Sequence, residues 1–380
     1  MLIPLSLYIH IPWCIKKCPY CDFNSHSDKD IPEKAYIAAL KKDLLTEKPF
    51  SNGRKLTSIF IGGGTPSLFS AESISEILDF AEREIGFADN IEITLEANPG
   101  TAEQQRFAGY RQAGINRLSM GVQSFNDLHL QKLGRIHSSD NAKQAFSMAR
   151  QAGFDNINLD LMHGLPGQSI TEALSDLESA FELTPEHLSW YQLTIEPNTA
   201  FYSAPPVLPH DETLIDIQEQ GQKLLAKNGY QQYEVSAYCK NAQQSQHNLN
   251  YWQFGDYLAI GAGAHGKYSQ VTNDNALTVH RRNKTRQPSA YLSRTDHFTA
   301  QQSTIEPEDL PLEFMMNALR LSKGVPRDYF QQRTGLDFSV VAPILSQLQQ
   351  QSLISSDSQR IGTTAQGLLF LNNILEKFDP

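Results

Sequence analysis

The feature that most constrains the fold is a repeated alternation of short apolar runs and amphipathic stretches over the first 230 residues. The apolar runs have the length of strands and cover residues 7–11, 58–61, 91–95, 117–122, 156–161 and 187–193. Stretches with apolar residues at helical spacing follow at residues 32–47, 71–85, 103–113, 140–152, 171–183 and 211–228. Strand–helix alternation is typical of a parallel sheet with right-handed crossovers. The sequence therefore predicts an α/β fold with an open, partial (β/α)6 barrel over residues 1–230.

The pattern changes after residue 230. Residues 230–238 alternate like an antiparallel or edge strand, and residues 261–298 are rich in glycine, basic and polar side chains, which is typical of irregular or hairpin structure. Residues 231–304 are therefore predicted to form a β or irregular extension. Two helical stretches, a short apolar pair, a polar turn and a final helix predict a winged-helix-like domain over residues 305–380.

Charge and hydropathy restrict the possible partners. The net charge is −10, and residues 305–380 hold six Lys and Arg against nine Asp and Glu. Nucleic-acid binding is not expected, because it needs clustered basic residues. No apolar stretch reaches the length of a membrane span, and the N-terminus lacks a signal-peptide pattern. A cytoplasmic protein is predicted, with peripheral contact at the inner membrane left open.

Three of the four cysteines lie close together, as Cys14, Cys18 and Cys21, in the spacing C-x3-C-x2-C. A cubane iron–sulfur cluster normally takes four cysteines. Three would leave one iron open to the amino and carboxylate groups of S-adenosylmethionine. Two alternatives remain: a zinc site completed by His10 and His26, or thiols buried as small apolar groups. Since the motif directly follows the first predicted strand, where barrel enzymes place their chemistry, we favour the [4Fe–4S] cluster.

Polar residues recur at the ends of the other predicted strands. Glycines 62–64 follow one strand and permit close backbone approach to a ligand. Glu96, Gln123 and Asp160 lie on or after later apolar runs, and Arg135 could bind a carboxylate bidentately. Each alone is typical of a capped loop or a surface charge. Together they suit a ligand with ribose hydroxyls, an amine and a carboxylate.

These segments also resemble a known family. YIHIPWC (8–14), CDF (21–23), GGGTP (62–66) and GVQSF (121–125) are similar to the radical-SAM family of oxygen-independent coproporphyrinogen III oxidases and their relatives, and the resemblance covers nearly the whole chain. It implies a [4Fe–4S] cluster and S-adenosylmethionine as cofactors. By the same resemblance, the cofactor contacts are Tyr8, Tyr20, Gly63, Gly64, Thr65, Glu96, Gln123, Arg135, Asp160 and Thr194.

Within that family the chain resembles the HemW-type heme chaperones. The oxidases carry a further cysteine where this sequence has Phe23, and a longer N-terminal extension than the seven residues before Tyr8. The chaperone branch carries an H-N-x-x-Y-W motif, present here at residues 247–252. The resemblance favours His247 as a heme ligand, whereas the residues alone are more typical of a buried histidine beside core aromatics.

The resemblance therefore implies a heme chaperone, a monomer or weak dimer, that transfers heme to an acceptor hemoprotein, itself a candidate for membrane association. The alternatives are coproporphyrinogen III oxidase activity and, from another class, a zinc-binding regulatory module. The basic run at residues 280–286 could meet heme propionates, an acidic partner or an anionic membrane. By default such a run is a solvated loop.

Overall fold

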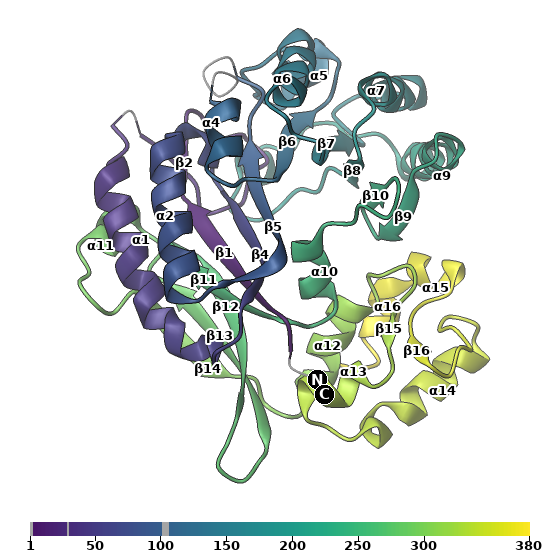
Figure 1. Cartoon of the computed structure of the whole chain (residues 1–380). Coiled ribbons are helices and arrows are strands. Elements are labelled where there is room, and N and C mark those ends of the chain that lie inside the picture. The colour runs from purple at the N-terminus through teal and green to yellow at the C-terminus, as the bar shows by residue number, and fades with distance from the viewer. Residues whose placement is uncertain (1–2, 29, 101–105) are drawn as a thin grey trace.

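A large mixed sheet organises the molecule (Figure 1). A computed structural model of the chain describes residues 3–28, 30–100 and 106–380. In these residues the strand order is β14-β13-β12-β11-β1-β4-β5-β6-β7-β8-β10-β9, and the two end strands do not pair to close a barrel. Six parallel strands form its centre: β1 (Leu5–Ile11), β4 (Leu56–Gly63), β5 (Phe87–Ala97), β6 (Arg117–Gln123), β7 (Ile157–His163) and β8 (His187–Gln192). The predicted α/β fold with a partial barrel is confirmed.

Helices connect the parallel strands and cover the outer face of the sheet. The long ones match the predicted stretches, although the start of the predicted helix at 103–113 falls partly outside the described residues. Ser70, Ser138 and Ser169 cap three of them by accepting a hydrogen bond from a backbone N–H of the first turn. The helices are α1 (Glu33–Glu47), α2 (Ala71–Glu84), α4 (Phe107–Gln112), α6 (Ser139–Gln151), α7 (Ile170–Leu183) and α9 (Asp211–Lys227).

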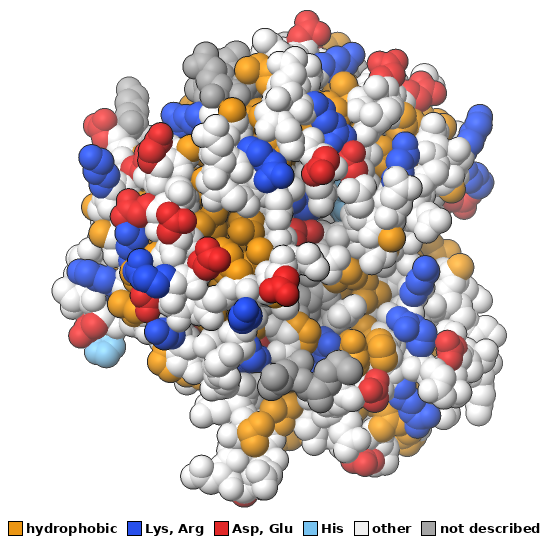
Figure 2. Space-filling model, viewed as in Figure 1, with side chains coloured by type: hydrophobic (Ala, Val, Ile, Leu, Met, Phe, Trp, Pro, Cys, Tyr) orange, Lys and Arg blue, Asp and Glu red, His pale blue; other side chains and the backbone are white. Residues whose placement is uncertain are grey.

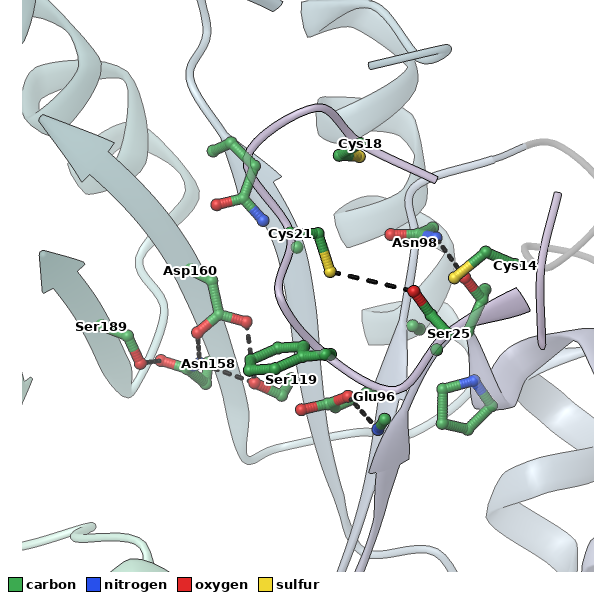
Figure 3. A pocket seen from close by; sticks show the side chains of 18 of the residues that line it. Cys14, Cys18, Cys21, Ser25, Glu96, Asn98, Ser119, Asn158, Asp160 and Ser189 are labelled. Atoms are coloured by element: carbon green, nitrogen blue, oxygen red, sulfur yellow. Dashed lines mark hydrogen bonds between the residues drawn. The ribbon is translucent and has the colours of Figure 1, made fainter. Parts of the chain in front are cut away.

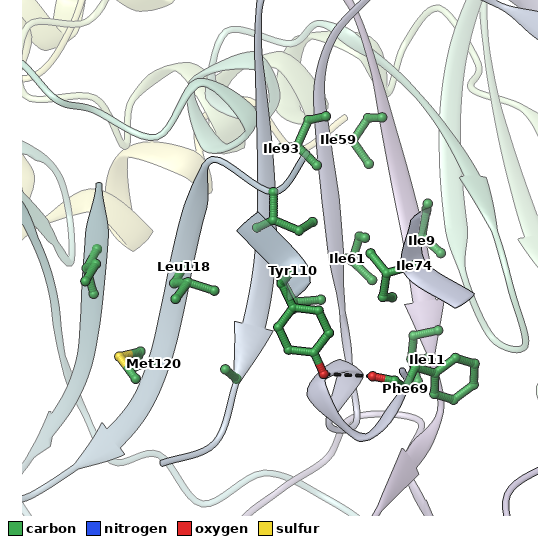
Figure 4. Packing of buried hydrophobic residues seen from close by; sticks show 14 of the residues in the cluster. Ile9, Ile11, Ile59, Ile61, Phe69, Ile74, Ile93, Tyr110, Leu118 and Met120 are labelled. Atoms are coloured by element: carbon green, nitrogen blue, oxygen red, sulfur yellow. Dashed lines mark hydrogen bonds between the residues drawn. The ribbon is translucent and has the colours of Figure 1, made fainter. Parts of the chain in front are cut away.

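The main core lies between the sheet and these helices (Figure 4). Alternate residues of the strands point toward it, such as Ile9 and Ile11 in β1 and Leu118 and Met120 in β6. The Tyr110 hydroxyl donates to the Phe69 carbonyl at 2.7 Å, which satisfies a buried polar group inside this layer. Because side chains alternate along a strand, the residues between these apolar ones face the interior of the partial barrel.

Residues 231–304 extend the same sheet at both edges. β9 (Gln231–Glu234) and β10 (Ala237–Cys239) continue it antiparallel beyond β8. β11 (Asp256–Ile260) pairs parallel with β1, and β12 (His265–Val271), β13 (Leu277–Lys284) and β14 (Thr299–Thr304) follow antiparallel. The expectation of a solvated loop at residues 280–286 is wrong for most of the run, since it lies in β13 between two strands. Lys284 is buried there and pairs with Asp43 at 2.5 Å and with Glu47 at 2.6 Å.

The C-terminal residues form a helical unit with a two-stranded sheet, in a winged-helix-like order. A second hydrophobic cluster fills it and also takes in Tyr233, Phe254 and Val279 from the sheet extension. The division into domains at residues 230 and 304 stays a prediction. The elements are α12 (Leu310–Ala318), β15 (Val325–Pro326), α13 (Tyr329–Thr334), α14 (Ala342–Gln350), β16 (Arg360–Ile361), α15 (Ala365–Leu369) and α16 (Leu371–Leu375).

Shorter elements complete the fold: β2 (Trp13–Cys14), β3 (His26–Ser27), α5 (Asp127–Lys132), α8 (Ala200–Ser203), α10 (Gln246–Trp252) and α11 (Pro288–Leu292). Acidic and basic side chains are interspersed over the face shown in Figure 2. In the described part of the chain, no helix has the length and apolar character that a bilayer crossing requires.

Candidate metal and cofactor site

A cavity of about 410 Å³ opens at the C-terminal ends of the parallel strands. The loop that carries the three clustered cysteines forms one side of it, and side chains from β5, β6, β7 and β8 form its floor (Figure 3). This is the end of the sheet at which parallel α/β folds bind their ligands. Sequence elements far apart in the chain are thereby brought to one place.

The cysteine loop is held at its two ends. β2 pairs parallel with β3, with Trp13 opposite His26, and the His26 backbone N–H donates to the Pro12 carbonyl at 2.7 Å. Cys14, Cys18 and Cys21 are all partly buried and all line the cavity. Burial raises the pKa of the Cys14 and Cys21 thiols, while hydrogen bonds with Ser25 act in the opposite direction on both. Coordination to iron would displace the thiol protons.

The donors at this cavity fit a cluster held by three cysteines. The fourth cysteine, Cys239, is buried in β10 within the second hydrophobic cluster. Arg135 directs its Nη1 toward the Cys18 Sγ at 3.6 Å, which places a positive charge beside the sulfur. Three thiols on one loop, with a cavity beside them, are the set required when one iron is left for a small-molecule ligand.

The two histidines that could complete a zinc site are hydrogen-bonded to other groups. His10 Nδ1 is hydrogen-bonded to the Tyr8 hydroxyl at 2.9 Å, and His10 Nε2 to the Asn24 carbonyl at 2.9 Å. His26 Nε2 contacts the Asn24 side-chain oxygen at 3.3 Å. Within the described ranges, no three His, Cys, Asp or Glu side chains are grouped closely enough to hold a single metal ion.

Two carboxylates lie on the floor of the cavity (Figure 3). Burial, and then the charge of Asp160, raise the pKa of Glu96 to about 7, although its Oε2 accepts a hydrogen bond from the Gly63 N–H at 3.0 Å. Burial also raises the pKa of Asp160, against hydrogen bonds from Asn158 at 2.8 Å and Ser119 at 3.0 Å. A carboxyl group whose pKa lies near neutral pH can ionise there, and it then accepts hydrogen bonds from ribose hydroxyls or an ammonium group.

Hydrogen bonds connect several other polar side chains that line the cavity. Arg135 Nη2 donates to the Gly121 carbonyl and to the Asn98 side-chain oxygen, each at 2.7 Å. Asn98 in turn donates to the Thr65 hydroxyl at 2.9 Å. Gln123 ends β6 at a φ of +69° and accepts from the Tyr191 hydroxyl at 3.0 Å. These bonds fix the orientations of side chains that a ligand would meet.

Glycine is required at the end of β4. A Cβ at position 64 would lie 2.5 Å from the Trp13 carbonyl oxygen, so only glycine lets this turn pass under the cysteine loop. Gly63 has a φ of +113°, which favours glycine for a second reason. The two residues thus allow β4 to end directly against β2.

The structure brings together most of the residues that the sequence predicts as cofactor contacts. Thr194 does not line the cavity, because it lies exposed on the loop after β8 and donates to Glu196 at 2.7 Å. Tyr8 lines an adjoining cavity instead. The residues that line the main cavity are Tyr20, Gly63, Gly64, Thr65, Glu96, Gln123, Arg135 and Asp160, with the three cysteines.

His247 lies beneath the surface rather than in a cavity. It is 1% exposed, and its Nδ1 is hydrogen-bonded to the Ser58 hydroxyl at 3.1 Å. Its ring stacks on Phe60 with centroids 5.1 Å apart and meets Tyr251 edge-on at 4.9 Å. Burial, and then the charge of Arg117, lower its pKa to about 3, so the imidazole is neutral. Its role as a heme ligand stays a prediction.

Several residues that line the cavity are not among the predicted cofactor contacts, and most of them lie within strands. A signal for them exists, because polar or small residues repeat at every second position, as in Ser119–Gly121–Gln123 and Asn158–Asp160, and therefore share one face. The missed residues include Asn98, Ser119, Asn158, Ser189 and Tyr191.

The chain is similar over its length to known proteins. Residues 8–180 match the model of the Radical SAM superfamily, and residues 305–370 match that of the HemN C-terminal domain. The chain is 54% identical to the heme chaperone HemW of Haemophilus influenzae and 51% identical to that of Escherichia coli, in both cases over 99% of this chain and 98% of the relative. It is 33% identical to the mitochondrial radical S-adenosyl methionine domain-containing protein 1 of Bos taurus, over 97% of this chain and 86% of that protein.

A solved structure agrees with these matches. Coproporphyrinogen III oxidase HemN from Escherichia coli, described as a radical SAM enzyme, has a TM-score of 0.80 at 25% identity and covers 100% of this chain and 90% of its own. Sequence and structure thus agree on both the barrel and the C-terminal domain, and the chain belongs to the HemW family of radical-SAM proteins.

Proposed function

We propose that this protein is a heme chaperone that binds heme and transfers it to an acceptor hemoprotein. The proposal depends on its identity of 54% and 51% to two proteins named as heme chaperones, matched over almost their full lengths. We also propose that it carries a [4Fe–4S] cluster on Cys14, Cys18 and Cys21, and exchangeable S-adenosylmethionine in the 410 Å³ cavity. A cytoplasmic location and a monomeric or weakly dimeric state remain predictions.

The lining residues suit these cofactors. When bound, the cluster can supply an electron to the sulfonium of S-adenosylmethionine. Arg135 holds a positive charge beside Cys18, and its bonds to Gly121 and Asn98 keep it there. Glu96 and Asp160 offer acceptors from the floor of the cavity, while Gly63 and Gly64 offer close backbone approach. We propose that these residues, together with Tyr8, Tyr20, Thr65 and Gln123, position the methionyl and ribose groups.

The test is a heme-transfer experiment. Anaerobically reconstituted protein is titrated with heme, with and without S-adenosylmethionine, and is then mixed with an apo-hemoprotein whose holo form has a distinct absorption spectrum. We expect stoichiometric heme binding and faster formation of the holoprotein than from free heme at the same concentration. Failure to bind heme, or transfer no faster than from free heme, would overturn the chaperone function.

A specific observation supports a second candidate, oxidation of coproporphyrinogen III. The fold matches that of HemN with a TM-score of 0.80. Against this candidate, Phe23 lies at the cavity in the position where the resemblance places a further cysteine in the oxidases. Anaerobic incubation of the reconstituted protein with coproporphyrinogen III and S-adenosylmethionine separates the two functions, since steady formation of protoporphyrinogen would support the oxidase. Iron and zinc analysis of anaerobically purified protein tests the zinc-binding alternative.

A further inference from the structure

Gln123, whose side chain lines the cofactor cavity, is held in an unusual backbone conformation. It ends β6 with a φ of +69°, in the left-handed region that few residues other than glycine adopt. The Ser124 N–H donates to the Val122 carbonyl at 2.9 Å, which closes a three-residue turn around Gln123. A turn of this kind with a positive φ is rare and strained. Such a conformation persists only where the surrounding structure holds it.

The pairing of β6 with β7 changes at the same point. Gly121 lies opposite Asp160 and Gln123 lies opposite Leu161, so two residues of β6 are matched by one residue of β7. A β-bulge of this kind redirects the side chain that follows it. The redirected Gln123 side chain accepts a hydrogen bond from the Tyr191 hydroxyl at 3.0 Å, and both residues line the cavity. The bulge and the turn together therefore decide where the Gln123 amide lies.

Asp176 reaches this turn from outside the cavity. It belongs to α7, is 3% exposed and does not line the cofactor cavity. One of its carboxylate oxygens accepts a hydrogen bond from the Phe125 N–H at 2.6 Å, and the other accepts one from the Ser124 hydroxyl at 2.8 Å. The Ser124 Oγ in turn accepts from the Asn126 N–H at 3.0 Å. Both carboxylate oxygens are thus bound to the two residues that directly follow Gln123.

A carboxylate at this position is unfavourable for the packing of α7. Burial raises the pKa of Asp176 to about 7, against the hydrogen bonds from Phe125 and Ser124, and the charge of Glu172 on the same helix raises it further. The other buried residues of α7 are the apolar Ala173, Leu177 and Ala180. An apolar residue in place of Asp176 would avoid the cost of burying a charge but could not accept the two hydrogen bonds. The bonds to the turn are therefore what this carboxylate adds.

Other side chains hold the residues that precede Gln123. Arg135 donates to the Gly121 carbonyl at 2.7 Å. The His137 Nε2 is hydrogen-bonded to the Val122 carbonyl at 3.0 Å, and because a carbonyl only accepts, this nitrogen carries the proton. The backbone is thus fixed on both sides of Gln123, and Asp176 supplies the side toward α5.

We propose that Asp176 is a positioning residue for the cofactor site: it holds the strained turn that places the Gln123 amide in the cavity, and it thereby raises the affinity for S-adenosylmethionine. The inference rests on the proposed function, which puts this cofactor in the cavity and Gln123 among its contacts. Asp176 acts through Gln123 and does not touch the cofactor, and no covalent bond is made or broken. Without the carboxylate, Gln123 should relax toward an ordinary negative φ and move its amide away from Tyr191.

The first experiment measures the affinity for S-adenosylmethionine in the full-length, anaerobically reconstituted protein. The change in the electron paramagnetic resonance spectrum of the reduced cluster on addition of S-adenosylmethionine gives the dissociation constant. We expect Asp176→Asn to weaken binding about tenfold, with an unchanged iron content, because the amide offers one acceptor oxygen where the carboxylate offers two. Glu178→Gln is the matched control, since Glu178 lies exposed on the same helix. Ser124→Ala removes one of the two bonds and should weaken binding to a smaller extent.

The second experiment separates positioning from general stability. If Asp176 acts through the Gln123 amide, Asp176→Asn should cause no further loss of affinity in protein that already carries Gln123→Ala. Hydrogen exchange in the cluster-free protein gives a readout that needs no cofactor. The backbone amides of residues 121–126 should exchange faster in Asp176→Asn than in the wild type or Glu178→Gln.

The outcomes separate this role from the proposed function. If S-adenosylmethionine leaves the spectrum of the wild type unchanged, the proposed cofactor site itself is overturned. If the wild type responds and Asp176→Asn keeps the same affinity, the positioning role is wrong and the cofactor site stands. An equal loss of affinity with and without the Gln123 amide would also overturn the role, because the effect would then not pass through Gln123. If Asp176→Asn takes up no iron, Ser124→Ala decides, and wild-type affinity in that variant contradicts the proposal.

Discussion

Glu96 shows how the fold changes the chemistry of a single side chain. Its pKa is raised to about 7, from an ordinary value near 4.5, so the folded protein holds this proton more tightly than the unfolded chain. Stability from this group is therefore present at low pH and is lost as the pH rises through about 7. The side chain is only half-buried, so the loss should be about 1–3 kcal/mol after screening by water in the cavity.

We predict that Glu96→Gln removes this part of the pH dependence. Urea unfolding of the cluster-free protein at acidic and at slightly alkaline pH measures this dependence. From the acidic to the alkaline pH, the free energy of unfolding of the wild type should fall by about 1–3 kcal/mol more than that of the variant. Glu376→Gln, an exposed residue near the C-terminus, should behave as the wild type. Equal pH dependence in the wild type and Glu96→Gln would show that Glu96 titrates normally.

The cysteines give a second prediction at this scale. Cys18→Ser should abolish or strongly reduce iron incorporation on anaerobic reconstitution, because only two of the three thiolates would remain to hold the cluster. Cys239→Ser is the matched control, since that thiol is buried in β10 away from the cavity. Iron and sulfide analysis measures the outcome. A full complement of iron in the Cys18 variant would exclude this residue as a ligand.

Individual site residues could be predicted from the sequence where local spacing decides their position. The cysteines lie in one short segment, and Glu96, Gln123 and Asp160 lie in recognisable strands. Thr194 could not be placed in this way, because the loop after β8 turns its side chain toward Glu196. The burial of His247 depends on Ser58 and Phe60 of β4, about 190 residues earlier, and no local pattern reports such a contact.

At the scale of elements, Asn24 joins the cysteine loop to the sheet extension. Its side-chain amide donates to the Ala262 and Arg286 carbonyls, both at 2.9 Å. These bonds hold the segment after Cys21 against the turn between β11 and β12 and against the residues that follow β13. The Asn24 side chain therefore adds to the contacts that already hold this segment, such as the bond between His10 and the Asn24 carbonyl.

We predict that Asn24→Ala destabilises this loop by about 1–2 kcal/mol, as expected for two partly exposed hydrogen bonds. Faster hydrogen exchange in residues 21–26 and faster loss of iron in air should reveal it, with little change in the helices of the C-terminal domain. Asn373→Ala, an exposed residue of α16, is the control. Unaltered exchange in residues 21–26 of Asn24→Ala would contradict this role.

The six central strands were predictable because each is a compact apolar run between helical stretches. β11 was missed, since Asp256–Ile260 is short and follows a polar, aromatic region. Its place is fixed by β1, whose second edge needs a partner. The basic run of β13 was misread because the partners of Lys284 lie in α1, more than 230 residues earlier.

At the scale of the whole molecule, the second hydrophobic cluster joins the C-terminal domain to the sheet. Phe314 is fully buried and meets Phe254 edge-on at 5.6 Å and Phe330 at 5.3 Å. We predict that Phe314→Ala lowers the free energy of unfolding by about 3–5 kcal/mol, whereas Phe370→Ala, which is 48% exposed, costs far less. Urea unfolding measures both. An equal loss of unfolding free energy in the two variants would show that Phe314 contributes no more to stability than an exposed phenylalanine does.

The position of β1 in the sheet affects the order in which the protein can assemble. β1 is made first, yet one of its two neighbours, β11, is made about 250 residues later. A nascent chain that ends before residue 256 therefore carries an apolar strand with an unsatisfied edge, the kind of edge that recruits other chains. Ribosome-bound fragments of that length should remain sensitive to protease and depend on cellular folding factors. This should last until Asp256–Ile260 emerges and pairs with the free edge of β1.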